Sequence, residues 1–345
     1  LAPRPGSRYA RDPVRRAAAA ASRSLRMAET HHLDWRPENL FWGYFDAATP
    51  PALEVASGDE VVLDCLPACT MEDLPPSAAG VLPEHVAAME ALAGAKGASP
   101  HMITGPVFVR GAAPGDVLQV DILEAAPAQD WGFTAILPLL GALPDEFTDY
   151  ERMHIEIDRA AGTCRLPIGV DLPLDPFFGI VAVAPPKEWG RIGAAEPRAF
   201  GGNMDNKELR PGTTLYLPVF NEGALFSAGD GHGRQGDGEV CIAAVETALR
   251  GRFRLTVRKD MSITQPFAET PETLMSMGFD EDLDEAMRKA LRDMIRLVAE
   301  RGGITRNQAY MLLSLAGDLR ITQVVDGEKG VHMLMEKRWL PKRGG

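Results

Sequence analysis

Short apolar runs separated by turn residues fill most of the chain after residue 52, a pattern typical of β-strands. In one run, Val117, Val120 and Ile122 are apolar while Gln119 and Asp121 are polar, as expected for a strand with one buried face. Further strands are predicted at Leu53–Val55, Val61–Cys65, Pro106–Val109, His154–Ile157, Gly179–Val183, Thr214–Pro218, Glu239–Val245 and Arg252–Val257. The spacing of these runs predicts a β-rich α+β fold with a mixed β-sandwich or barrel-like core.

Helices are expected to be few, and the clearest spans 283–301. Its apolar residues recur at helical spacing, acidic residues 280–282 precede it, and glycines 302–303 follow it. Two shorter helices at Pro83–Leu92 and Arg306–Leu315, and a hairpin of Ile321–Val325 with Val331–Met335, complete the predicted elements. Thr305 is the expected N-cap of the last helix.

Composition narrows the classes of partner. The chain has 345 residues and a net charge of −12, which argues against nucleic acid and against an anionic membrane surface. No apolar stretch reaches the ~18 residues of a membrane-spanning helix. The four cysteines, Cys65, Cys69, Cys164 and Cys241, lack the paired spacing of a zinc site. We expect them to be reduced thiols in a cytoplasmic protein.

The first 26 residues differ from the rest, with seven arginines and one acidic residue. They fit either a gene start placed too early, with initiation at Met27, or an arginine-rich targeting segment. We expect residues 1–26 to be disordered and residues 27–345 to form the folded domain.

Residues 201–240 carry the strongest candidate for chemistry. Amide, carboxylate and imidazole side chains lie there among many glycines: Asn203, Asp205, Asp230, His232, Gln235, Asp237 and Glu239. Glycine permits close approach to backbone or ligand, and we expect a surface loop that performs chemistry instead of building a core. A G-x-G-x-x-G pattern at 231–236 lacks the helix that must follow in a dinucleotide site. A metal or polar-substrate loop and a tight turn with solvated acids both remain open.

A carboxylate-rich set with one imidazole suits Zn²⁺, Mn²⁺ or Ca²⁺. His101, directly before a predicted strand, is a further candidate. No G-x-S-x-G elbow occurs, and no cysteine has a recognisable catalytic partner, so a serine or cysteine nucleophile is not expected.

Several blocks in order resemble the acetamidase/formamidase family of amide hydrolases, over nearly everything after residue 30. The blocks are His101–Asp116, Gly201–Asn206, Leu215–Val219, Gly223–His232 continuing into Gln235–Glu239, and Asp318–His332. The resemblance implies hydrolysis of short aliphatic amides such as formamide or acetamide to ammonia and a carboxylate. It also implies a β-rich fold, a bound divalent metal and a homo-oligomer. Gly233 and Arg234 depart from the Ala-Ala pair that often follows the histidine, and Arg234 is a candidate for favouring a substrate that carries a carboxylate.

Given this resemblance, we expect a metal-activated water to attack the amide. Asp205, Asp230 and His232 are the expected metal ligands, with zinc as the expected ion and calcium or manganese as alternatives. Glu239 is the first candidate for the catalytic general base, and Asp237 is the second. Asn203, Gln235 and His101 are the expected substrate-binding residues. A non-catalytic metal- or ligand-binding protein and a hydrolase of another C–N bond, such as a lactam, remain alternatives.

Overall fold

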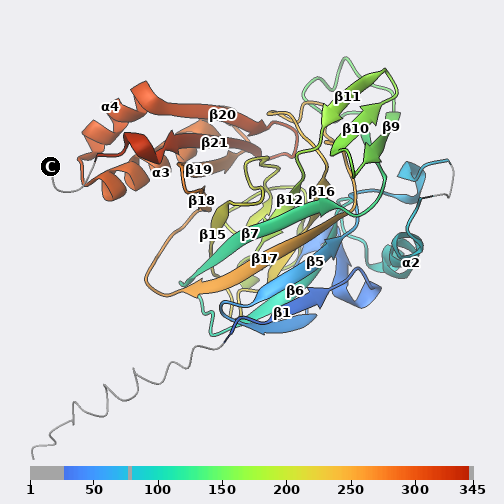
Figure 1. Cartoon of the computed structure of the whole chain (residues 1–345), viewed down its shortest axis with the longest axis horizontal. Coiled ribbons are helices and arrows are strands. Elements are labelled where there is room, and N and C mark those ends of the chain that lie inside the picture. The colour runs from blue at the N-terminus through green and yellow to red at the C-terminus, as the bar shows by residue number, and fades with distance from the viewer. Residues whose placement is uncertain (1–26, 77–79, 342–345) are drawn as a thin grey trace, which may run out of the picture.

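The computed structural model describes residues 27–76 and 80–341, and the described part of the chain is dominated by β-strands (Figure 1). The expected disordered segment 1–26 lies outside the described residues. The nine-stranded sheet runs in the order β1 (Thr30–Leu33), β5 (Glu60–Cys65), β17 (Leu249–Arg258), β7 (Val117–Pro127), β15 (Thr214–Pro218), β18 (Phe267–Glu269), β19 (Thr273–Asp280), β21 (Lys329–Glu336) and β20 (Gly317–Gln323).

A six-stranded sheet carries the segments that matter most for the site. It runs in the order β14 (Gly201–Asn203), β12 (Phe177–Ala182), β16 (Phe226–His232), β6 (Met102–Arg110) and β2 (Leu40–Trp42), with β4 (Leu53–Ala56) also paired to β6. A four-stranded sheet contains β11 (Val170–Pro173), β10 (Thr163–Leu166), β9 (Glu151–Asp158) and β8 (Trp131–Ile136). β13 (Ile192–Gly193) pairs with β3 (Tyr44–Phe45).

The main core lies between the nine-stranded and six-stranded sheets. Phe253 of β17 packs edge-on against Phe178 of β12, with ring centroids 5.1 Å apart, and also contacts Phe226 of β16 at 5.5 Å. Buried and more exposed residues alternate along most of β17, because successive side chains of a strand point to opposite faces. Arg250 and Arg254 therefore point outward, where they pair with acidic groups of β5. The two sheets form the predicted sandwich.

Two helices cover the far end of the nine-stranded sheet, next to β19–β21 (Figure 1). They are α3 (Leu283–Gly302) and α4 (Arg306–Ala316), and α2 (Pro83–Leu92) lies apart from them. Asp282 caps α3 by accepting a hydrogen bond from the Glu285 N–H at 3.0 Å, and Gly303 ends it in the left-handed conformation. None of the described helices is long and apolar enough to cross a membrane.

The β-rich fold class, the sandwich and the main helices predicted from the sequence are confirmed, and the four cysteines are free thiols. Thr305 caps α4 as expected. The sheets of the described residues are open, so the barrel alternative is not realised. The predicted strand Glu239–Val245 is wrong: Glu239 and Ile242 have φ of 46° and 82°, which a strand cannot accommodate.

The expectation of a surface loop at 201–240 is also wrong. Thr214–Pro218 is the strand that the sequence predicts, but Asp230 and His232, expected in a loop, lie on the fully buried strand β16. Glycine-rich sequence favours loops locally, but pairing with β12 and β6 on both sides holds this segment in the sheet.

Candidate active site

Strand β12 lies between the two segments that supply the predicted metal ligands. Its Ile180 is opposite Asn203 of β14 on one side, and its Phe177 is opposite His232 of β16 on the other. Asp205 follows β14 directly, so Asp205 and Asp230 face each other across Gly179 of β12. A Cβ at Gly179 would overlap both Asp230 Oδ2 and Asp205 Oδ1. The absence of a side chain at this position allows the two carboxylates to meet.

His232 is the centre of the cluster. Its Nε2 lies 3.1 Å from Asp230 Oδ2 and 3.4 Å from Glu246 Oε1, and its Nδ1 lies 2.9 Å from Gln235 Oε1. Asp205 Oδ1 is 3.9 Å from Nδ1. Two groups with metal-ligand geometry therefore share this histidine: Asp205, His232 and Glu239 form one, and Asp230, His232 and Glu246 form the other, with the ligand atoms of each group within 4.8 Å of one another.

Several carboxylate oxygens of this cluster are buried without a hydrogen-bond partner. They are Asp205 Oδ1, Asp230 Oδ1, Glu239 Oε2, Glu246 Oε2 and Asp326 Oδ2. Buried polar atoms in folded proteins are almost always satisfied, and burying an unpaired carboxylate is costly. Five carboxyl groups around one imidazole thus fit a bound cation, which would compensate their charge and occupy their free lone pairs.

The pKa values of these groups move in opposite directions. Burial raises the pKa of Asp205 well above its usual range, and Asp326 and Asp230 add to the shift. Burial also raises the pKa of Glu239 well above its usual range, and that of Glu246 to about 7. Burial acts in the same direction on Asp230, but His232 and His101 outweigh it and lower the pKa of that carboxyl.

The imidazoles respond to the same surroundings. Burial lowers the pKa of His101. It also disfavours the charged form of His232, but the carboxylates of Glu246 and Asp230 outweigh it and raise the pKa of His232 well above its usual range. Without a cation, these surroundings favour the protonated forms of Asp205, Glu239 and Glu246, and the positive charge of an ion would oppose that effect.

Three of the clustered acids have a strained backbone. The φ angles of Asp205, Asp230 and Glu239 are 45°, 55° and 46°, in the left-handed region that residues other than glycine rarely adopt. Such strain is concentrated at functional sites, where the surrounding structure imposes it to aim a side chain. Here the left-handed backbone conformation directs all three carboxylates toward the cluster around His232.

The cluster forms part of the wall of a cavity of about 600 Å³. Asn203, His101 and Glu239, three of the residues expected to act on the substrate, line this cavity. Asn203 Nδ2 donates to Asp205 Oδ2 at 2.6 Å, which leaves Asn203 Oδ1 without a hydrogen-bond partner. His101 Nδ1 lies 2.9 Å from Ser99 Oγ, and its Nε2 is 3.9 Å from Asp230 Oδ2.

Gln235 and Asp237 lie elsewhere. Gln235 is buried behind the cluster, where it contacts His232 through Oε1 and donates to the Asp205 carbonyl from Nε2 at 2.8 Å. Asp237 is exposed and forms an ion pair with Lys207 at 2.9 Å, outside the cavity. Arg234 donates to the carbonyl of Pro173 and does not line the cavity either.

Sequence reasoning missed two acids of the cluster. Glu246 is a single acid that follows the apolar residues 243–245. An acidic residue in such an apolar context was the only sequence feature that could have indicated its role. Asp326 stands in the turn between β20 and β21, where an acidic residue is ordinarily solvated. Nothing in the local sequence of Asp326 distinguishes it from such a turn residue.

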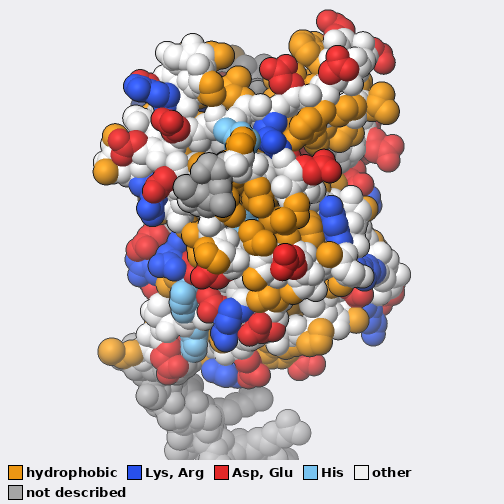
Figure 2. Space-filling view, turned by 90° about the vertical axis from the view of Figure 1, so that its right-hand side faces the viewer, with side chains coloured by type: hydrophobic (Ala, Val, Ile, Leu, Met, Phe, Trp, Pro, Cys, Tyr) orange, Lys and Arg blue, Asp and Glu red, His pale blue; other side chains and the backbone are white. Residues whose placement is uncertain are grey.

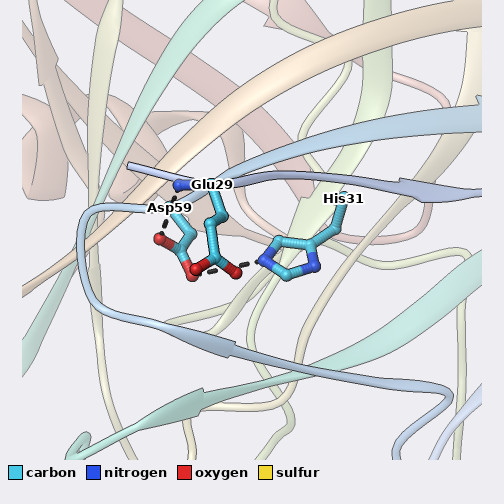
Figure 3. A group of neighbouring side chains, drawn as sticks. All are labelled: Glu29, His31 and Asp59. Atoms are coloured by element: carbon cyan, nitrogen blue, oxygen red, sulfur yellow. Dashed lines mark hydrogen bonds and ion pairs between the residues drawn. The ribbon is translucent and has the colours of Figure 1, made fainter. Parts of the chain in front are cut away.

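A third group, Glu29, His31 and Asp59, has metal-ligand spacing but different chemistry (Figure 3). Asp59 Oδ1 accepts the Glu29 N–H at 3.0 Å, and Oδ2 accepts the Ala56 N–H at 2.9 Å. His31 Nε2 lies 3.2 Å from the same Oδ2. Backbone donors therefore occupy both oxygens of Asp59, and this carboxylate joins β1 to the turn between β4 and β5.

Comparison with known proteins places the chain in a family. A sequence profile of the acetamidase/formamidase family matches residues 44–192 and 190–335. The acetamidase of Mycolicibacterium smegmatis is 28% identical over 198 residues, covering 41% of this chain and 49% of that protein. The formamidase of Methylophilus methylotrophus is 30% identical over 255 residues, covering 56% of this chain and 63% of that protein. The matched region thus spans about half to two thirds of the length of these relatives.

A solved structure is similar over a greater length. The acetamidase of Bacillus halodurans superposes with a TM-score of 0.78 at 30% identity, over 91% of this chain and 100% of that one. Since the family profile also covers most of the sequence, the chain belongs to the acetamidase/formamidase family.

Proposed function

We propose that this chain hydrolyses the C–N bond of linear primary amides of the formamide and acetamide type. Water adds to the carbonyl carbon, the C–N bond breaks, and the products are a carboxylate and ammonia. The observation that carries the proposal is the convergence of unpartnered buried carboxylates around His232 on the wall of a cavity. The names of the similar proteins, acetamidase and formamidase, point to the same reaction.

We propose that Asp205, Asp230 and His232 hold a divalent metal ion, with Glu246 beside them. One imidazole with several carboxylates suits zinc, and calcium or manganese are the alternatives. An ion held there supplies Lewis acidity, because it polarises an amide carbonyl and makes water more acidic. The unpartnered oxygens of Asp205 and Asp230 support these two residues as ligands.

Glu239 is the proposed general base. It is buried, lines the cavity and has one oxygen free of hydrogen bonds. When ionised, this carboxylate can accept the proton of the attacking water and return that proton to the departing nitrogen. This return is essential because an amide nitrogen leaves poorly until it is protonated.

The other polar residues have positioning tasks in this proposal. The free Oδ1 of Asn203 accepts an N–H of the substrate amide, and His101, directly before β6, lines the same cavity. Gln235 keeps His232 and the backbone of Asp205 in place through its two hydrogen bonds. The substrate is thereby held with its carbonyl toward the acidic cluster.

We further propose that the chain assembles with copies of itself. Figure 2 shows hydrophobic side chains gathered on the face that carries α2 and β9–β11. The segment between β8 and β9 also exposes Leu143 and Phe147, by 53% and 50%. Large exposed apolar areas usually mark interaction surfaces.

Light scattering measured on the protein as it leaves a size-exclusion column tests this proposal. The measured mass should be a multiple of the 37.3 kDa chain mass, and a monomer at micromolar concentration would contradict assembly.

The direct test is ammonia release from formamide, acetamide and propionamide, measured with metal content on the same sample. We expect activity that chelation abolishes and that one divalent ion restores. Metal-loaded protein that releases no ammonia from any amide would contradict the amidase proposal and favour a non-catalytic binding protein.

Glu239→Gln tests the proposed base. The amide keeps the shape of the side chain but cannot accept the proton, so kcat should fall by ~10²- to 10⁴-fold with metal still bound. Asp237→Asn is the comparison, because Asp237 is the second candidate and its carboxylate pairs with Lys207 outside the cavity. A larger loss in Asp237→Asn than in Glu239→Gln would reverse the assignment.

Gly179→Ala tests the cation site without changing any ligand. The new Cβ would push Asp205 and Asp230 apart, so metal affinity and kcat should fall by about 10- to 100-fold, as for other disturbed ligand supports. Gly236→Ala is the matched control, because a Cβ there meets no other atom. Full metal content in purified Gly179→Ala would show that the two carboxylates do not share an ion.

A further inference from the structure

The cavity is larger than formamide or acetamide requires. Its volume of about 600 Å³ falls in the range of roughly 300–1,000 Å³ that is typical of pockets for much larger ligands. Acetamide has only a methyl group beside its amide, and the polar cluster alone could hold a molecule of that size. The rest of the cavity is therefore available to a longer acyl group.

Part of the wall of this cavity is apolar and adjoins the acidic cluster. It is lined by Phe133, Ala135, Leu137, Leu140, Ile242 and Val325. Phe133 and Ala135 are two residues apart on β8 and so share a face of the strand. Phe133 exchanges both backbone hydrogen bonds with Glu246, the residue that lies 3.4 Å from His232. The apolar wall therefore continues directly from the place where the amide is proposed to react.

Ile242 is held in this wall by a strained backbone. Its φ of 82° is exceptional for a β-branched residue, and its N–H donates to the carbonyl of Glu239 at 3.0 Å in the same turn. The turn that aims the proposed base thus also presents an isoleucine to the cavity. Strain of this kind persists where the position of the side chain matters.

The charges around the cavity disfavour an anionic substrate. Glu72 and Glu196 line it in addition to the cluster, as does Asp73, which is paired with Arg152 at 3.5 Å. Among the described residues that line it, Lys96 is the single lysine or arginine, and the Nζ of Lys96 lies over the Trp42 ring, 4.7 Å from the centroid. Arg234, the candidate partner for a substrate carboxylate, is engaged with Pro173 elsewhere. A neutral acyl group fits these surroundings better than a charged one.

We propose that the preferred substrates are primary amides of neutral, apolar acyl groups several carbons long, with the acyl chain lying along the wall from Phe133 to Ile242. This inference rests on the proposed amidase function. The reaction is unchanged: one water is consumed, the C–N bond breaks, and ammonia and a longer-chain carboxylate are released.

The test is a series of amides with metal-loaded enzyme: acetamide, butyramide, hexanamide and adipamate, whose chain matches hexanamide but ends in a carboxylate. Each methylene that enters the wall should raise kcat/KM by up to about fourfold, so hexanamide should exceed acetamide by ~10- to 100-fold. Adipamate should be at least about tenfold poorer than hexanamide, because its charge meets an acidic cavity.

The outcomes distinguish the preference for longer acyl groups from the amidase activity itself. A kcat/KM that falls from acetamide to hexanamide would overturn this inference and leave the amidase proposal intact. Adipamate hydrolysed as well as hexanamide would overturn the neutral-substrate part. Hydrolysis of no amide would overturn the amidase proposal and this inference with it.

Ile242→Gly tests the wall itself. Glycine adopts positive φ freely, so this variant removes the apolar side chain without adding backbone strain. The ratio of kcat/KM for hexanamide to that for acetamide should fall by ~10-fold. Leu139→Gly is the matched control: Leu139 also has positive φ, at 65°, but it is 78% exposed and does not line the cavity. An equal ratio in the two variants would contradict the assignment of Ile242.

Discussion

Carboxylates repel one another and lose hydration when they are buried, and both effects raise the free energy of the folded state. The arrangement of residues around His232 depends on how the fold compensates this free-energy cost. Asp205 and Asp230 approach each other only because Gly179 has no side chain between them. The register of β14, β12 and β16 determines which residues meet at that point. The sandwich core beneath these strands therefore holds in place a group of charges that would otherwise separate.

The other features of the site follow from this constraint. The left-handed backbones of Asp205, Asp230 and Glu239 aim their side chains inward, and the unpartnered oxygens fit a cation that balances them. Glu239 belongs to the cluster and also lines the cavity, so its carboxylate lies between the proposed metal site and the space proposed for the substrate. The apolar wall begins at Phe133, whose backbone pairs with Glu246, and ends at Ile242, which follows Glu239 in the same turn. One region thus combines charge, strain and an apolar surface.

Much of the fold was predictable because local signals agreed with the tertiary structure. Thr214–Pro218 and Pro83–Leu92 match their predicted bounds, and Thr305 caps its helix as its sequence indicates. The error at Glu239–Val245 arose because apolar composition favours a strand, whereas the site requires positive φ there. Sheet pairing likewise overrode the loop preference of the glycines around Asp230.

The candidate site was predictable in part. The sequence indicated that Asp205, Asp230 and Glu239 belong together, but not that they are buried, that Asp237 lies apart from them, or that Asp326 joins them from a distant turn. That turn comes near the cluster only through long-range sheet packing, which no local pattern encodes.

The most direct measurement of the central claim is anomalous X-ray diffraction at metal absorption edges from crystals of the purified protein. The account predicts an anomalous peak within coordination distance of carboxylate oxygens of both Asp205 and Asp230 and of a His232 ring nitrogen. If no peak were present there, and the same carboxylate oxygens were instead hydrogen-bonded to ordered water, the cation-centred interpretation of this cluster would be contradicted.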